Sequence, residues 1–125
     1  MINLKTDISF FQFDSHNVLV TVKKKDFDGI EIPFVLDNTV IYLSIKDKDD
    51  SGGSVLAALS SADSSEIEIT DSANGIFVIH FNKTNTGDKV SVGTFFYDII
   101  IVGDEFSYTV KKNKIEFFRP ITVLA

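Results

Sequence analysis

Apolar and polar residues alternate along most of this chain at the period of two that is typical of β-strands. The most apolar run, residues 95–102, carries apolar side chains on both sets of alternate positions, so neither face of this strand can remain in water. Shorter runs of the same kind are expected at residues 18–22, 39–45, 67–69, 76–81, 106–110 and 115–117. Turn signals separate them, among them Asp28-Gly29, Asn74-Gly75 and Gly103-Asp104-Glu105.

This spacing, without any long run at the helical period, predicts an all-β fold: an antiparallel β-sandwich of about seven to eight strands. At most one short helical turn is expected, at residues 55–59, where VLAAL after Ser54 suits a capped turn of helix as well as a short strand. Pro33 makes residues 30–36 either an edge strand or an irregular approach to the following strand, and residues 112–114 are expected to turn the chain before its last strand. The length of 125 residues and the absence of a linker or repeat predict one domain over residues 1–125.

Residues 1–13 are either a first strand or an N-terminal arm. Phe10, Phe11 and Phe13 precede a polar break at residues 14–17. Aromatic side chains are mostly buried within their own domain, which favours a role in the core. The alternative is an arm that docks these three phenylalanines on a partner, because apolar area beyond a few hundred Å² usually marks a protein contact.

Charge and composition exclude several classes of partner. The net charge is −6 and the longest basic run is Lys23-Lys24-Lys25, so no nucleic-acid partner is expected. The chain has no cysteine, which excludes disulfides and thiolate metal sites. No apolar run approaches the ~20 residues that span a bilayer, and the first residues do not resemble a signal peptide. We therefore expect a soluble protein with no membrane contact.

Two features could carry chemistry, and both are weak. Asp47, Asp49 and Ser51 match the start of a calcium loop, with Gly52 at its sixth position, but the twelfth position is Ala58 rather than glutamate. A solvated acidic loop is the alternative to a metal site. His16 and His80 are the only histidines, and no serine lies in a nucleophile elbow. We predict no catalytic residue and no cofactor, and we keep a small hydrolase only as a third hypothesis.

A family resemblance covers residues 18–123. It is carried by an Asp-Gly turn and an apolar strand at residues 28–45, by Asn74-Gly75 before a strand, and by the motif G-x-F-x-Y-D-I at residues 93–99, with Thr109 and Ile121-Thr122 beyond it. This pattern resembles an Ig-like domain of tailed-phage virion proteins, and it is similar to the N-terminal domain of phage baseplate upper proteins and related tail or head-appendage proteins.

The resemblance implies an Ig-like sandwich and a non-enzymatic structural protein of a bacteriophage virion, in the tail, the baseplate or associated with the head. Its implied partners are other virion proteins and copies of itself, and its implied location is the virion, after synthesis in the host cytoplasm. The alternative hypothesis is a carbohydrate-binding or adhesion module, in which Tyr42, Tyr108 or a phenylalanine stacks on a surface glycan.

Overall fold

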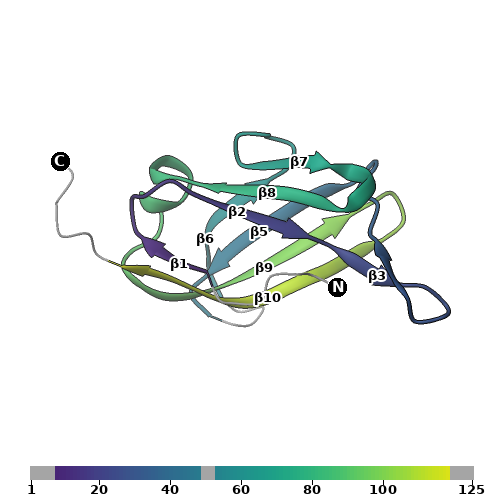
Figure 1. Cartoon of the computed structure of the whole chain (residues 1–125). Helices are drawn as coiled ribbons and strands as arrows, with labels where there is room; N and C mark the ends of the chain where they lie inside the picture. The colour runs from purple at the N-terminus through teal and green to yellow at the C-terminus, as the bar shows by residue number, and fades with distance from the viewer. Residues whose placement is uncertain (1–7, 49–52, 119–125) are drawn as a thin grey trace.

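The computed structural model describes residues 8–48 and 53–118, and a five-stranded sheet is its larger layer (Figure 1). The strands of this sheet lie in the order β1-β10-β9-β5-β6. They are β1 (Ile8–Phe11), β5 (Val40–Lys46), β6 (Val55–Ser60), β9 (Gly93–Val102) and β10 (Ser107–Phe118). Neighbouring strands run antiparallel except for β1, which runs parallel to β10 along one edge.

A three-stranded sheet in the order β2-β8-β7 forms the second layer (Figure 1). Its strands are β2 (His16–Thr21), β7 (Ile67–Asp71) and β8 (Ile76–Phe81). A separate two-stranded hairpin, formed by β3 (Lys23–Lys25) and β4 (Glu31–Pro33), projects from one end of the sandwich. A 3₁₀ turn at Ser72–Asn74 joins β7 to β8, and a π turn at Lys83–Gly87 lies between β8 and β9.

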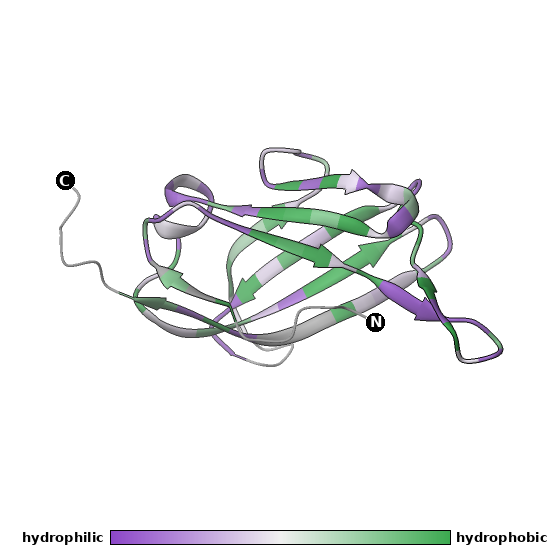
Figure 2. Cartoon of the chain, viewed as in Figure 1, coloured by the Kyte–Doolittle hydropathy of each residue, from purple (hydrophilic) through white to green (hydrophobic). Residues whose placement is uncertain are grey.

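The core lies between the two sheets and follows the alternation of the sequence. In β9, Tyr97, Ile99 and Ile101 are buried, whereas the residues between them are half-exposed on the outer face. The facing strand β8 buries Phe77 and Ile79 in the same way. Figure 2 shows that β8 and the second half of β9 are largely hydrophobic (green). Side chains from both sheets therefore close a single apolar cluster within the described residues.

The all-β sandwich predicted from the sequence is confirmed, with ten strands in the described residues rather than seven to eight. Part of the difference comes from residues 16–25, where the sequence predicted a single strand at residues 18–22. The segment instead changes partner around the buried residue Val22, so that β2 belongs to the smaller sheet and β3 to the hairpin. The pairing of β4 as part of a separate hairpin agrees with the edge position expected from Pro33.

Two local predictions are wrong. Residues 55–59 form strand β6 rather than a turn of helix, because pairing with β5 buries Ala57 and Leu59 on the core side. Residues 112–114 do not turn the chain. They continue β10, which pairs along the whole length of β9, and Lys112 lies opposite Asp98. The irregularity in this strand is a bulge between Thr109 and Lys111 instead.

Gly75 is the point where the smaller sheet and the hairpin meet. Its carbonyl accepts a hydrogen bond from the backbone N–H of Val22 at 2.8 Å, and the carbonyl of Val22 accepts one from Phe34 at 3.0 Å. Gly75 has a φ of +71°, the left-handed conformation that favours glycine. The two hydrogen bonds at Val22 determine where the hairpin leaves the sandwich and where Phe34 lies.

Candidate interaction site

An open groove of about 440 Å³ lies at the end of the sandwich that carries the hairpin. Lys24, Phe34 and Val35 line it from the hairpin side, and Phe106, Ser107 and Tyr108 line it from the start of β10. Tyr108 lies opposite the buried Ile101 on the inner side of the five-stranded sheet. Tyr108 is nevertheless exposed, and Phe34, which follows β4, packs against its ring.

Three aromatic rings and one ammonium group define the surface of this groove. The rings of Phe34 and Tyr108 are stacked, with centroids 5.5 Å apart and planes 7° apart. Phe106 meets Phe34 edge-on at 6.2 Å, and the Lys24 Nζ lies 5.9 Å from the centre of the Phe34 ring. Aromatic and cation–π contacts of this kind fix the orientation of the rings. The groove is therefore a preformed apolar platform with a positive charge at one side.

The tip of the β3–β4 hairpin presents two further apolar side chains, Phe27 and Ile30. The Phe27 side chain is fully exposed, and Ile30 is also exposed. The turn beneath them is well ordered, because the Asp26 carboxylate accepts hydrogen bonds from the backbone N–H groups of Asp28 (2.9 Å) and Ile30 (3.0 Å). Gly29 supplies the positive φ that this turn requires. An exposed phenylalanine on an ordered protruding turn is a feature that a partner could bind.

The opening segment does not bring its three phenylalanines to one surface. Phe10 is 8% exposed and packs in the protein's own core, with ring centroids 5.2 Å from Phe81 and 5.1 Å from Phe117. This corrects the hypothesis that Phe10 belongs to an interface. Phe13 is half-buried, with the Lys83 Nζ 5.8 Å from its ring centre. Phe11 lies in β1, and its side chain lies outside what the structure describes.

The candidate calcium loop lies largely outside the described residues. This applies to Asp49 and Ser51, so their relation to Asp47 stays a prediction. One carboxylate oxygen of Asp47 accepts a hydrogen bond from the backbone N–H of Ser54 at 2.7 Å, which ties the two ends of the loop together. In residues 8–48 and 53–118, no three histidine, cysteine, aspartate or glutamate side chains are grouped so that they could hold a metal ion.

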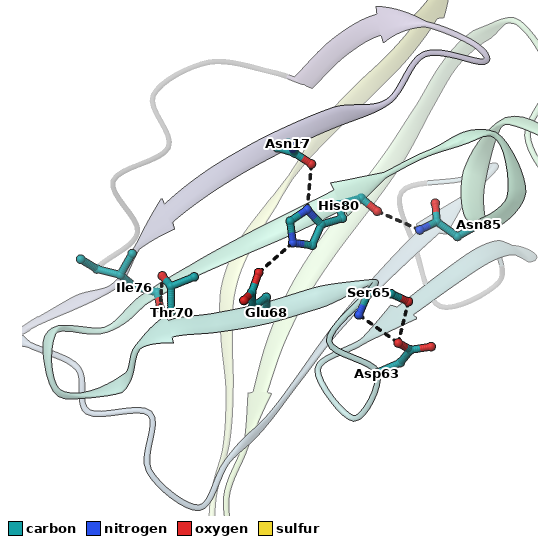
Figure 3. A network of polar contacts seen from close by, with 8 residues as sticks. All are labelled: Asn17, Asp63, Ser65, Glu68, Thr70, Ile76, His80 and Asn85. Carbon is teal, nitrogen blue, oxygen red and sulfur yellow. Dashed lines mark hydrogen bonds and ion pairs between the residues drawn. The ribbon is translucent and has the colours of Figure 1, made fainter.

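His80 lies on the outer face of the smaller sheet, because its neighbours in β8, Ile79 and Phe81, are buried. Its Nδ1 is 2.8 Å from the Asn17 amide oxygen on β2, and its Nε2 is 3.2 Å from a Glu68 carboxylate oxygen on β7 (Figure 3). The ring therefore bridges all three strands of this sheet. Its two nitrogens are engaged by an amide oxygen and a carboxylate oxygen, which hold the ring in place. The arrangement is a cross-strand support for the sheet.

A second polar contact in Figure 3 stabilises the turn before β7. The hydroxyl and the backbone N–H of Ser65 both donate to one carboxylate oxygen of Asp63, at 2.6 and 2.9 Å. These two bonds, the hydroxyl first, lower the pKa of Asp63 below its usual value, because they favour the ionised form. The carboxylate is exposed to solvent and its role is local to the turn.

The two tyrosines proposed for glycan stacking lie on different surfaces. Tyr108 is part of the groove, whereas Tyr42 lies opposite Ile100 on the outer face of the five-stranded sheet. That outer face is a second, flatter apolar surface, on which Tyr42 and Val55 are exposed and Phe96 and Ile100 are half-buried. One set of alternate apolar side chains in β9 therefore lies in the core, and the other set lies on this outer face.

Sequence reasoning missed most of the groove and the hairpin tip. The alternating pattern placed Phe106 and Tyr108 in one strand, but it gave no reason to bring Phe34 and Lys24 to them. Phe27 carried a usable signal, because a phenylalanine directly beside an Asp-Gly turn has no strand position in which to be buried. The groove itself depends on contacts between segments that are far apart in the sequence, which no local pattern reports.

Comparison with known protein families and curated proteins gives no match from which a function could be inferred. No protein-family model matches the sequence, and no curated protein is significantly similar to it. Among the residues that the structure describes, no helix has both the length and the apolar character needed to cross a membrane.

Proposed function

We propose that this chain is a non-enzymatic structural protein of a bacteriophage virion, belonging to the tail, the baseplate or the head-associated parts. It acts through protein–protein contacts during assembly of the particle. The observation that carries the proposal is the concentration of exposed apolar side chains at one end of the sandwich: Phe27, Ile30, Val35, Phe106 and Tyr108.

Two lines of reasoning support this proposal. Stable monomeric proteins rarely expose large contiguous apolar patches, and a patch of this kind usually marks a surface that another protein covers. The groove is lined by aromatic and aliphatic side chains with one lysine and one serine, a composition suited to binding a side chain rather than to acid–base chemistry. The resemblance of residues 18–123 to Ig-like domains of tailed-phage virion proteins is the reason for proposing a bacteriophage particle.

The test is whether the protein is part of a particle. Particles released from cells that carry its gene should be purified by density gradient and washed in high salt, and the chain should be quantified by mass spectrometry. We expect the chain in a constant ratio to the most abundant particle protein across the gradient fractions. A host protein of similar size serves as the control for carry-over. A chain found in the free soluble fraction and absent from the particles would contradict the proposal.

A carbohydrate-binding module is the second candidate, favoured by the stacked pair of Phe34 and Tyr108 in an open groove beside Lys24 and Ser107. Sugars are bound by stacking on exposed rings, with polar groups at their edges. If this interpretation is right, a glycan array should give reproducible hits that Tyr108→Ala weakens at least about tenfold. Tyr42→Ala, on the other face of the sheet, should keep them. An array without hits removes this candidate.

A further inference from the structure

We propose that two copies of this chain associate through their hairpins, with Phe27 of each copy inserted in the aromatic groove of the other. This inference rests on the proposed function, in which the end of the sandwich that carries the hairpin and the groove is a protein contact. It names a second copy of the chain as the partner at that contact. The proposed site thus combines a groove from one copy with a side chain from its partner.

The groove and the side chain match in size and chemistry. A volume of about 440 Å³ can admit a phenylalanine side chain with space for the adjoining backbone. Phe34, Phe106 and Tyr108 offer both ring faces and ring edges, and aromatic rings pair favourably in edge-to-face and offset-stacked arrangements. Phe27 is the fully exposed aromatic side chain of the hairpin, so it is available for such pairing.

The tip is ordered before it binds, which lowers the entropic cost of association. In addition to the two bonds accepted by the Asp26 carboxylate, the backbone N–H of Asp26 donates to the Ile30 carbonyl at 3.0 Å, and that of Gly29 donates to the Asp26 carbonyl at 3.1 Å. Phe27 therefore lies on a closed turn that projects away from the body of the sandwich (Figure 1).

The distance between tip and groove suits a reciprocal arrangement. Lys24 lines the groove at the base of the hairpin, and Phe27 follows three residues later in the turn at its tip, at most about 10 Å away. Two hairpins that lie side by side in opposite directions therefore bring the tip of each to the base of the other. Such a pair has two-fold symmetry, and each copy contributes the same patch.

The charges of the hairpin are complementary in this opposed orientation. Its base carries Lys23, Lys24 and Lys25, which Figure 2 shows as the strongly hydrophilic strand β3, whereas Asp26 and Asp28 flank Phe27 at the tip. Opposed hairpins place the acidic tip of one copy beside the lysines of the other. The exposed carboxylates of Asp104 and Glu105 lie on the β10 side of the groove, so an acidic tip is favoured on the Lys24 side.

The first test is the oligomeric state of the purified full chain, measured by analytical ultracentrifugation from about 10 µM to about 1 mM. We expect a concentration-dependent dimer in the wild type and a dissociation constant at least about tenfold higher in Phe27→Ser. Leu19→Ser is the matched control, because Leu19 is 64% exposed on the outer face of the smaller sheet, and it should leave the dimer unchanged. A wild type that stays monomeric, or a dimer unaffected by Phe27→Ser, overturns the proposal.

Charge reversal tests the opposed orientation. Lys24→Glu and Asp28→Lys should each weaken the dimer several-fold, because each places like charges at both contacts of the symmetric pair. The double variant restores opposite charges and should recover most of the wild-type affinity. A double variant as weak as the single variants overturns the opposed arrangement. Thermal unfolding of every variant, followed by circular dichroism, shows whether the variant is folded, so that a loss of association can be distinguished from a loss of folding.

The two proposals fail in different ways. A chain that remains monomeric in solution but is present in purified particles overturns the hairpin exchange and leaves the structural role intact. A chain that dimerises through Phe27 but is absent from particles leaves the hairpin exchange intact and overturns the structural role.

Discussion

Gly75→Ala should destabilise the fold by about 3 kcal/mol or more. A Cβ at this position would clash with the Val22 carbonyl oxygen and would lie 2.7 Å from the Phe34 carbonyl oxygen, and both are backbone atoms. The Val22 carbonyl is further held in place by the hydrogen bond it accepts from the backbone N–H of Phe34. The left-handed φ of +71° adds about 1–2 kcal/mol for any residue with a Cβ. Urea denaturation should show a lower midpoint with an unchanged slope.

Gly29→Ala is the matched control for this prediction. Gly29 also has a left-handed φ, of +79°, but a Cβ there would have no atom within 4 Å. The cost should therefore be limited to backbone strain of about 1 kcal/mol. The difference between the two variants isolates the steric part of the effect. Equal losses of stability in the two variants would show that close packing at the junction of the smaller sheet and the hairpin is not what requires glycine.

Phe10→Ala should destabilise the isolated chain by about 3 kcal/mol, as expected when a buried phenylalanine is truncated and leaves a cavity. The ring of Phe10 packs against Phe81 of the smaller sheet and Phe117 of the larger sheet, and it stacks on His16 at 4.9 Å. Its loss therefore weakens the contact between the two layers. The free energy of unfolding, measured by urea denaturation, should fall at every protein concentration.

Phe13→Ala is the companion variant, and it should cost only about 1 kcal/mol because that side chain is half-buried. The comparison also separates a core strand from an arm that docks on a partner. If Phe10→Ala left the stability of the isolated chain unchanged and reduced its association instead, the placement of Phe10 in the core would be wrong.

The sequence determined the layers of this protein because burial in a sheet alternates with the period of the side chains. Tyr97, Ile99 and Ile101 in β9 occupy every second position, and the structure buries that set. Because both sets of positions in β9 are apolar, the structure decided which set is buried. The sandwich itself was predictable, since many short alternating strands with turns between them and no helical run favour two packed sheets.

The local sequence pattern did not predict the secondary structure where the same residues suit two conformations. VLAAL at residues 55–59 suits a helical turn by propensity, and pairing with β5 decides for a strand. Residues 112–114 are polar enough for a turn, and the continuous partner β9 keeps them extended. In both cases the backbone hydrogen bonds offered by a neighbouring strand outweigh a weak local preference.

What the sequence determined by itself is the class of fold and the turn beside Phe27. Only the tertiary structure decided that Phe10 belongs to the core and that Lys24, Phe34 and Tyr108 meet in one groove. The physical reason is that alternation is a property of neighbouring residues. The groove arises where the chain leaves the smaller sheet at Val22, between β2 and β3, and where Phe34, bonded to Val22, lies against the start of β10. A contact between such distant segments is determined by the packing of the whole chain.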